Sequence, residues 1–65
     1  MWYVKDKNTG AYQREGILYA TYLCFRDCLK QDASFYYSME AAERAFVICD
    51  ETEEDFEVVF EQEEE

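Results

Sequence analysis

The chain contains no histidine, no proline and only two glycines among its 65 residues. Without histidine it cannot form the Ser–His or Cys–His pairs that activate nucleophiles in many hydrolases. Gly10 and Gly16 are too few to form a glycine-rich phosphate-binding loop. We therefore expect a protein that is not an enzyme.

Long apolar segments are also missing. No uncharged run approaches the ~20 apolar residues of a transmembrane helix. The N-terminal residues Met1–Asp6 show no basic region followed by an apolar core, which is the pattern of a signal peptide. These absences predict a cytoplasmic protein.

Cysteine is scarce and odd in number, with Cys24, Cys28 and Cys49. An odd count without a secretion signal argues against a disulfide scaffold. A closed zinc site needs four nitrogen or sulfur ligands, which this chain cannot supply from three cysteines alone. The acidic run Asp50–Asp55 offers oxygen ligands but lacks the order of a calcium-binding EF-hand loop. We expect no metal and no cofactor, with the cysteines serving as small apolar side chains.

Aromatic residues are abundant, with six Tyr, five Phe and one Trp, and they exclude a wholly disordered chain. At 65 residues we expect a single domain over 1–65, with 63–65 as a frayed acidic end. Such a chain buries only a small core, and five tyrosines exceed what that core needs: Tyr3, Tyr12, Tyr19, Tyr36 and Tyr37. We therefore expect a homodimer that buries aromatic surface.

The first half of the chain suggests a hairpin and then a helix. Alternation over 2–7 and 11–15, joined by Asn8-Thr9-Gly10, predicts a β-hairpin that Gly16 ends. Leu18, Tyr22, Phe25 and Leu29 then repeat at helical spacing, which predicts a helix over 17–31. The β-branched and aromatic content of 17–23 also allows a strand there.

The second half is predicted to contain a helix and a strand. Residues 34–37 are either a short strand or an irregular aromatic link. Ser38 is a candidate N-cap for a helix over 39–50, and alternation of Phe56, Val58 and Phe60 predicts a strand over 55–62. The predicted fold is α+β: a single layer of antiparallel-type sheet, made of the β-hairpin and the C-terminal strand, covered by two helices. Its expected core comprises Trp2, Val4, Leu18, Tyr22, Phe25, Leu29, Phe46, Phe56, Val58 and Phe60.

The charge is strongly segregated along the chain. Residues 1–49 carry six basic and six acidic side chains, whereas residues 50–65 carry ten acidic side chains and no basic one. The net charge of −10 therefore belongs to the last quarter of the sequence. Direct binding to nucleic acid or an anionic membrane is disfavoured, because phosphate contacts need Lys and Arg. A basic partner is favoured.

The acids of the predicted last strand are regularly placed. Asp55, Glu57 and Glu61 share one face, interrupted by Val59, while the opposite face would anchor the strand in the core. Alternate strand residues are about 6.6–6.8 Å apart, and one DNA strand presents a phosphate about every 3.4 Å. A held line of carboxylates can therefore imitate a line of phosphates. The candidate partner-binding residues are Asp50, Glu51, Glu53, Glu54, Asp55, Glu57, Glu61 and Glu63.

In size, net charge, lack of His and Pro, and the acids from Asp50 to Glu65, the chain resembles the small acidic bacteriophage proteins that mimic DNA. Those proteins share no motif or fold, so the resemblance transfers no residue roles. It implies an inhibitor of a basic host protein, such as a histone-like HU protein, RNA polymerase or a defence nuclease, in the host cytoplasm. It also implies a dimer and competition with DNA.

The acidic residues are equally compatible with simpler roles. Acidic C-terminal runs are often solvated tails that aid solubility, and charge on an edge strand protects against aggregation. The alternative function is a small adaptor that binds a protein through an aromatic surface, involving Tyr19, Tyr36 and Tyr37. High salt should weaken a DNA mimic strongly and an aromatic contact little.

Overall fold

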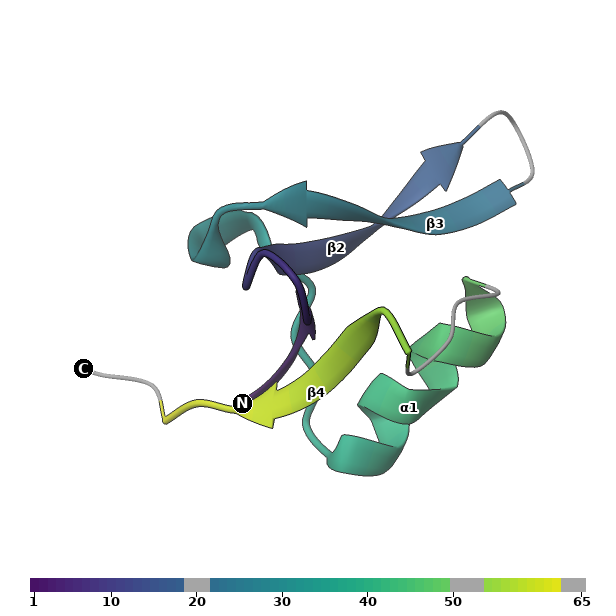
Figure 1. Ribbon diagram of the computed structural model, residues 1–65. Helices are drawn as coiled ribbons and strands as arrows, with labels where there is room; N and C mark the ends of the chain where they lie inside the picture. Colours follow the sequence, from purple (N-terminus) through teal and green to yellow (C-terminus); the bar gives the residue numbers. More distant parts are fainter. Residues whose placement is uncertain (19–21, 50–53, 63–65) are drawn as a thin grey trace.

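The computed structural model describes residues 1–18, 22–49 and 54–62. Within them the chain forms four strands, one α-helix and a short 3₁₀ helix (Figure 1). The elements are β1 (Trp2–Asp6), β2 (Tyr12–Leu18), β3 (Tyr22–Cys28), η1 (Lys30–Asp32), α1 (Met39–Ile48) and β4 (Phe56–Phe60). The strands form one antiparallel sheet in the order β3-β2-β1-β4.

The turn between β1 and β2 is fixed by local hydrogen bonds. The Asp6 carboxylate accepts from the backbone N–H groups of Asn8 and Thr9 at 2.7 and 3.1 Å. Gly10 has φ of 76°, which a residue with a Cβ adopts only with strain. The turn predicted at Asn8-Thr9-Gly10 is confirmed, and the first hairpin is therefore set by its own residues.

The predicted helix over 17–31 is wrong, and so is the predicted sheet covered by two helices. β2 continues through Gly16 to Leu18, and β3 returns beside it in register from Tyr12↔Cys28 to Leu18↔Tyr22. The helical spacing of apolar residues was coincidental, because the backbone of Tyr22–Cys28, which is rich in aromatic and apolar residues, is paired with β2. Leu29, expected in the core, is 67% exposed.

The second predicted helix is confirmed as α1. The Ser38 hydroxyl oxygen accepts from the Ala41 N–H at 3.1 Å, and Glu40 lies in the first turn, where the helix dipole favours an acid. The helix ends at Ile48 with Cys49 as its C-cap. The C-terminal strand predicted over 55–62 is confirmed as β4, Phe56–Phe60.

The segment from Ser34 to Tyr36 is hydrogen-bonded to both central strands of the sheet, β1 and β2. Trp2 and Tyr36 exchange two backbone hydrogen bonds of 2.9 Å, and the Ser34 N–H donates to the Gln13 carbonyl at 3.3 Å. Of the two alternatives left open for 34–37, the structure shows an isolated bridge rather than a strand. The segment therefore contacts both central strands and then leads into α1.

The core lies between α1 and a strongly curved sheet. A flat sheet would place β3 and β4 about 14 Å apart, since neighbouring strands are about 4.8 Å apart. Yet the rings of Phe25 on β3 and Phe56 on β4 are 5.2 Å apart between centroids. Phe46 on α1 contacts both rings, at 5.6 and 6.5 Å. The two edges of the sheet therefore curve towards each other around the helix.

The predicted core was partly correct. Val4, Phe25 and Phe46 are buried, and Trp2, Phe56 and Val58 pack against them. Phe60 is exposed like Leu29, and the side chains of Leu18 and Tyr22 lie outside the described residues. The additional buried residues are Tyr3, Gln13, Ala33, Ala42, Ala45 and Cys49.

Candidate functional site: the acidic edge

Three of the predicted acids lie together on an edge of the sheet. β4 pairs with β1 and has no other strand neighbour within the described residues. Phe56 and Val58 hold β4 against the core, and Glu57 between them is exposed. Glu54 and Asp55 are exposed in the turn just before the strand. We call Glu54, Asp55 and Glu57 the acidic edge.

The backbone of the acidic edge is held by hydrogen bonds. The Lys7 N–H donates to the Asp55 carbonyl at 2.9 Å, which ties the turn before β4 to the end of β1. Glu57 is directly opposite Lys5 in the register of β1 and β4. The Asp55 and Glu57 carboxylates therefore project from hydrogen-bonded backbone, and a partner need not order that backbone to engage them.

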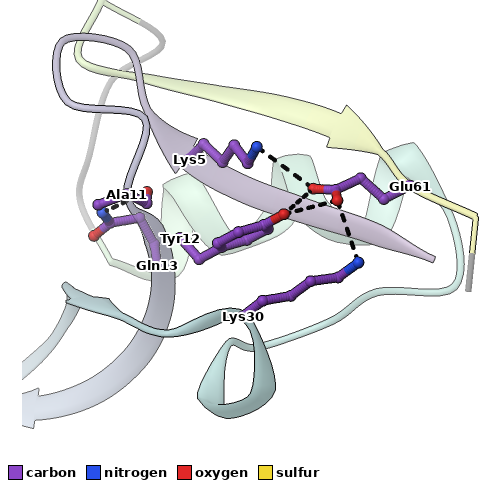
Figure 2. A network of polar contacts seen from close by, with 6 residues as sticks. All are labelled: Lys5, Ala11, Tyr12, Gln13, Lys30 and Glu61. Atoms are coloured by element: carbon purple, nitrogen blue, oxygen red, sulfur yellow. Dashed lines mark hydrogen bonds and ion pairs between the residues drawn. The ribbon is translucent and has the colours of Figure 1, made fainter.

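The other predicted acids are divided between two situations. Asp50, Glu51, Glu53 and Glu63 lie outside the described residues. Glu61 is described, but its side chain is half-buried and engaged by other residues of this chain. It follows the end of β4, and its carboxylate turns towards β1, β2 and η1 (Figure 2).

Glu61 is the centre of a cluster of four side chains, Lys5, Tyr12, Lys30 and Glu61, which we call the Glu61 cluster. The Tyr12 hydroxyl donates to the Glu61 carboxylate, at 2.7 Å from Oε1 and 2.5 Å from Oε2. Lys5 Nζ is 3.5 Å and Lys30 Nζ is 3.2 Å from the same carboxylate. Figure 2 shows both ammonium groups converging on it from opposite sides.

The environment of Glu61 stabilises its charged form. The Tyr12 hydrogen bond, assisted by Lys30 and Lys5, lowers the pKa of Glu61 despite the opposing effect of desolvation. Lys5 also lies over the Tyr12 ring, 4.5 Å from its centroid. Glu61 is therefore locally compensated, and the acidic edge is left to Glu54, Asp55 and Glu57 among the described predicted residues.

The same cluster fastens the two ends of the described chain. The Met1 ammonium donates to the Glu61 carbonyl at 3.0 Å, and the Glu61 N–H donates to the Met1 carbonyl at 2.9 Å. The sequence pattern does not predict this cluster. It places Lys30 on a helix, and it counts Tyr12 among the tyrosines that the core does not need. The one sequence signal for it is the predicted hairpin, which puts Lys5 and Tyr12 on neighbouring strands.

Two hollows flank these residues. One, of about 250 Å³, lies between α1 and β4 and is lined by Lys7, Met39, Glu43, Phe46, Phe56, Glu57 and Val58. The other is a larger groove of about 890 Å³, lined by Met1, Tyr3, Lys30, Gln31, Ala33, Phe35, Glu61 and Gln62. The first adjoins the acidic edge through Glu57, and the second adjoins the Glu61 cluster.

The remaining reactive groups show no catalytic arrangement within the described residues. Burial, together with the nearby Asp32 and Asp27, raises the pKa of the Cys28 thiol, although Arg14 opposes the shift. That thiol is therefore a weaker nucleophile than an ordinary cysteine at neutral pH. All three cysteines are free, and the described part of the chain has no group of three His, Cys, Asp or Glu side chains placed to hold a metal ion.

No family model, no curated protein and no solved structure matches this chain. Among its described residues no helix has the length and apolar character needed to cross a membrane.

Proposed function

We propose that this protein is a non-enzymatic DNA mimic, which binds the DNA-binding surface of a basic protein and competes with DNA. One observation carries the proposal: Glu54, Asp55 and Glu57 are exposed on or beside an edge strand whose alternate residues are anchored in the core. A partner can approach that edge without displacing another strand of the described sheet. The acids outside the described residues add charge to the same C-terminal quarter of the sequence.

The spacing of the acids supports a phosphate-like pattern. Glu57 lies in β4, where residues two apart are separated by about 6.6–6.8 Å, and Asp55 precedes it by two residues in the turn before the strand. That strand spacing is about twice the 3.4 Å interval between phosphates along one DNA strand. A basic groove that contacts successive phosphates could therefore engage the Glu57 carboxylate and, beside it, that of Asp55.

The energetics require several acids to act together. An exposed ion pair contributes only about 0.2–1 kcal/mol, because water and salt screen it. Long-range attraction by a net charge of −10 would mainly accelerate encounter with a basic surface. Binding should therefore weaken steeply as salt concentration rises, and no single Glu→Gln change on the acidic edge should abolish it.

The test is displacement of labelled duplex DNA from a basic DNA-binding protein, such as a bacterial histone-like protein. We expect the wild-type chain to release the DNA at low salt, and the double variant Asp55→Lys, Glu57→Lys to lose this activity. The matched control is Asp32→Lys, Glu40→Lys, which changes the net charge equally at exposed positions outside β4 and the acidic edge. Circular dichroism would verify that both variants are folded.

Two results would contradict the proposal. If a panel of basic DNA-binding proteins, from histone-like protein to polymerase and nuclease, retains its DNA, the mimic function is wrong. If both double variants compete equally well, the acidic edge is not the binding surface. Glu61 is left unchanged in these variants, because a lysine there would lie beside Lys5 and Lys30 and disturb the fold.

A second candidate, an adaptor with an aromatic binding surface, is favoured by one observation. Phe35 and Tyr37 are exposed, and their rings contact each other at 5.9 Å between centroids. Tyr36, expected to belong to this surface, is instead bridged to Trp2, and Tyr19 lies outside the described residues. Partner binding that persists at high salt and is lost in Phe35→Ser, Tyr37→Ser would support the adaptor.

A further inference from the structure

The hollow between α1 and β4 combines an apolar floor with charged walls. Phe46 is buried, Phe56 and Val58 pack against the same core, and Met39 is partly exposed at the start of α1. Glu43 on α1 and Glu57 on β4 line the hollow from its two sides. It therefore resembles neither a purely apolar cleft nor a simple acidic surface.

The size of the hollow limits what it can hold. At about 250 Å³ it is smaller than the ~300–1,000 Å³ of pockets that enclose drug-sized ligands. One long side chain of a partner protein is a better match. The floor favours an apolar stem, and the flanking carboxylates favour a positively charged end.

The charge balance of the hollow also favours a cation. Lys7 lines it together with Glu43 and Glu57, so one base stands against two acids. Of the two long basic side chains, arginine fits better, because its planar guanidinium stacks on aromatic rings and donates to carboxylates in two directions. The flexible Met39 side chain can adapt to the stem of the incoming residue.

We propose that this hollow receives an arginine side chain of the basic protein partner, and we call it the arginine hollow. The inference rests on the proposed function, which it deepens by supplying the apolar contact that exposed ion pairs lack. Glu57 belongs both to the acidic edge and to the arginine hollow. If an arginine of the partner occupied the hollow, the partner residues next to that arginine would lie along β4.

The test uses fluorescent octa-arginine, with octa-lysine and uncharged octa-citrulline for comparison. Binding is followed by anisotropy at low salt and by NMR of the Met39 and Val58 methyl groups. We expect octa-arginine to shift both methyl signals, octa-lysine to bind more weakly, and octa-citrulline not to bind.

Variants with matched charge changes isolate the hollow. Glu43→Gln should weaken octa-arginine binding about threefold to fivefold, as expected for one partly screened ion pair. Glu40→Gln is the control, because it lies on the same helix, removes the same charge and does not line the hollow. Lys7→Gln should strengthen binding, whereas Arg44→Gln, with the same charge change on α1, should have a smaller effect.

The inference is overturned if Glu43→Gln and Glu40→Gln behave alike, or if the Met39 and Val58 methyl signals do not move. Its failure is distinguishable from that of the proposed function. DNA displacement that survives Glu43→Gln unchanged but is lost in Asp55→Lys, Glu57→Lys would keep the mimic and reject the arginine hollow. Octa-arginine binding without DNA displacement would keep the arginine hollow and reject the DNA-mimic function.

Discussion

Glu57 and Glu61 show how two acids of the same strand segment acquire different roles. Their odd-numbered positions predict one shared partner-binding face. Glu57 lies within β4 and is exposed, whereas Glu61 lies beyond the strand, where Tyr12, Lys5 and Lys30 surround it. Sequence spacing identified the face, but only the positions of residues far away in the sequence decided which carboxylate is compensated.

Replacing Tyr12 by Phe tests the Glu61 cluster. A hydrogen bond to a charged group contributes about 1.5–3 kcal/mol, and we expect the free energy of unfolding to fall by about 1–2 kcal/mol at neutral pH. Because the Tyr12 hydrogen bond is the main cause of the lowered pKa of Glu61, that pKa should rise towards its ordinary value of 4.5. NMR titration of the Glu61 carboxyl carbon would measure the change.

The pH dependence of stability follows from the same shift. The folded-state pKa of Glu61 is lowered, so its stabilising contribution is present above the ordinary value of 4.5 and is lost as pH falls through the lowered pKa. The stability difference between wild type and Tyr12→Phe should therefore narrow at acidic pH in urea unfolding. Tyr37→Phe, at an exposed position, is the control. An unchanged Glu61 pKa in Tyr12→Phe would contradict the assignment.

At the scale of elements, the β2–β3 hairpin is the main departure from the predicted fold. Spacing of four and three residues between apolar side chains is compatible with a helix, but it does not exclude a strand in which Phe25 faces the core and Arg26 faces solvent. Backbone pairing with β2 decided that this segment is a strand and not a helix. The predictions that held were those with local signals, namely the Gly10 turn, the Ser38 cap and the alternation in β4.

The two glycines should respond in opposite ways to substitution by alanine. Gly10→Ala places a Cβ on a residue with φ of 76° and should destabilise the protein by about 1 kcal/mol. Gly16→Ala lies in β2, where its Cβ would be 3.1 Å from Cδ of the exposed Arg26. That flexible side chain can move, so reduced unfolded-state entropy should stabilise by about 0.4–1 kcal/mol. Urea unfolding measures both, and destabilisation by Gly16→Ala would show that Arg26 is fixed.

At the scale of the whole molecule, the segregation of charge bears on assembly. The acidic edge of one copy repels that of another, so contact between copies is better placed elsewhere. Exposed Phe35 and Tyr37 offer such a surface, whereas Tyr3 and Tyr12, counted as surplus from the sequence, are occupied around the Glu61 cluster. Phe35 and Tyr37 are not part of the acidic edge, so a dimer joined through them would not use those acids as contacts.

We predict that sedimentation at tens of micromolar gives twice the 7.8 kDa mass of one chain. Because the contact is apolar and the net charge is repulsive, added salt should favour the dimer. Phe35→Ser, Tyr37→Ser should sediment as a monomer, and Val47→Ser, at an exposed position on α1, should not change the mass. A single-chain mass for the wild-type protein at high salt would refute the dimer.

Features that depend on neighbouring residues follow from the sequence: the segregation of charge, the first turn, the start of α1 and the alternation in β4. Each depends on chemistry within a few residues, such as a positive φ at Gly10 or a hydroxyl at Ser38. Contacts between distant segments decided that β3 pairs with β2, that Glu61 is compensated while Glu57 is exposed, and that Glu43 and Glu57 line one hollow. These features arise from pairing and packing between distant segments, which local spacing does not specify.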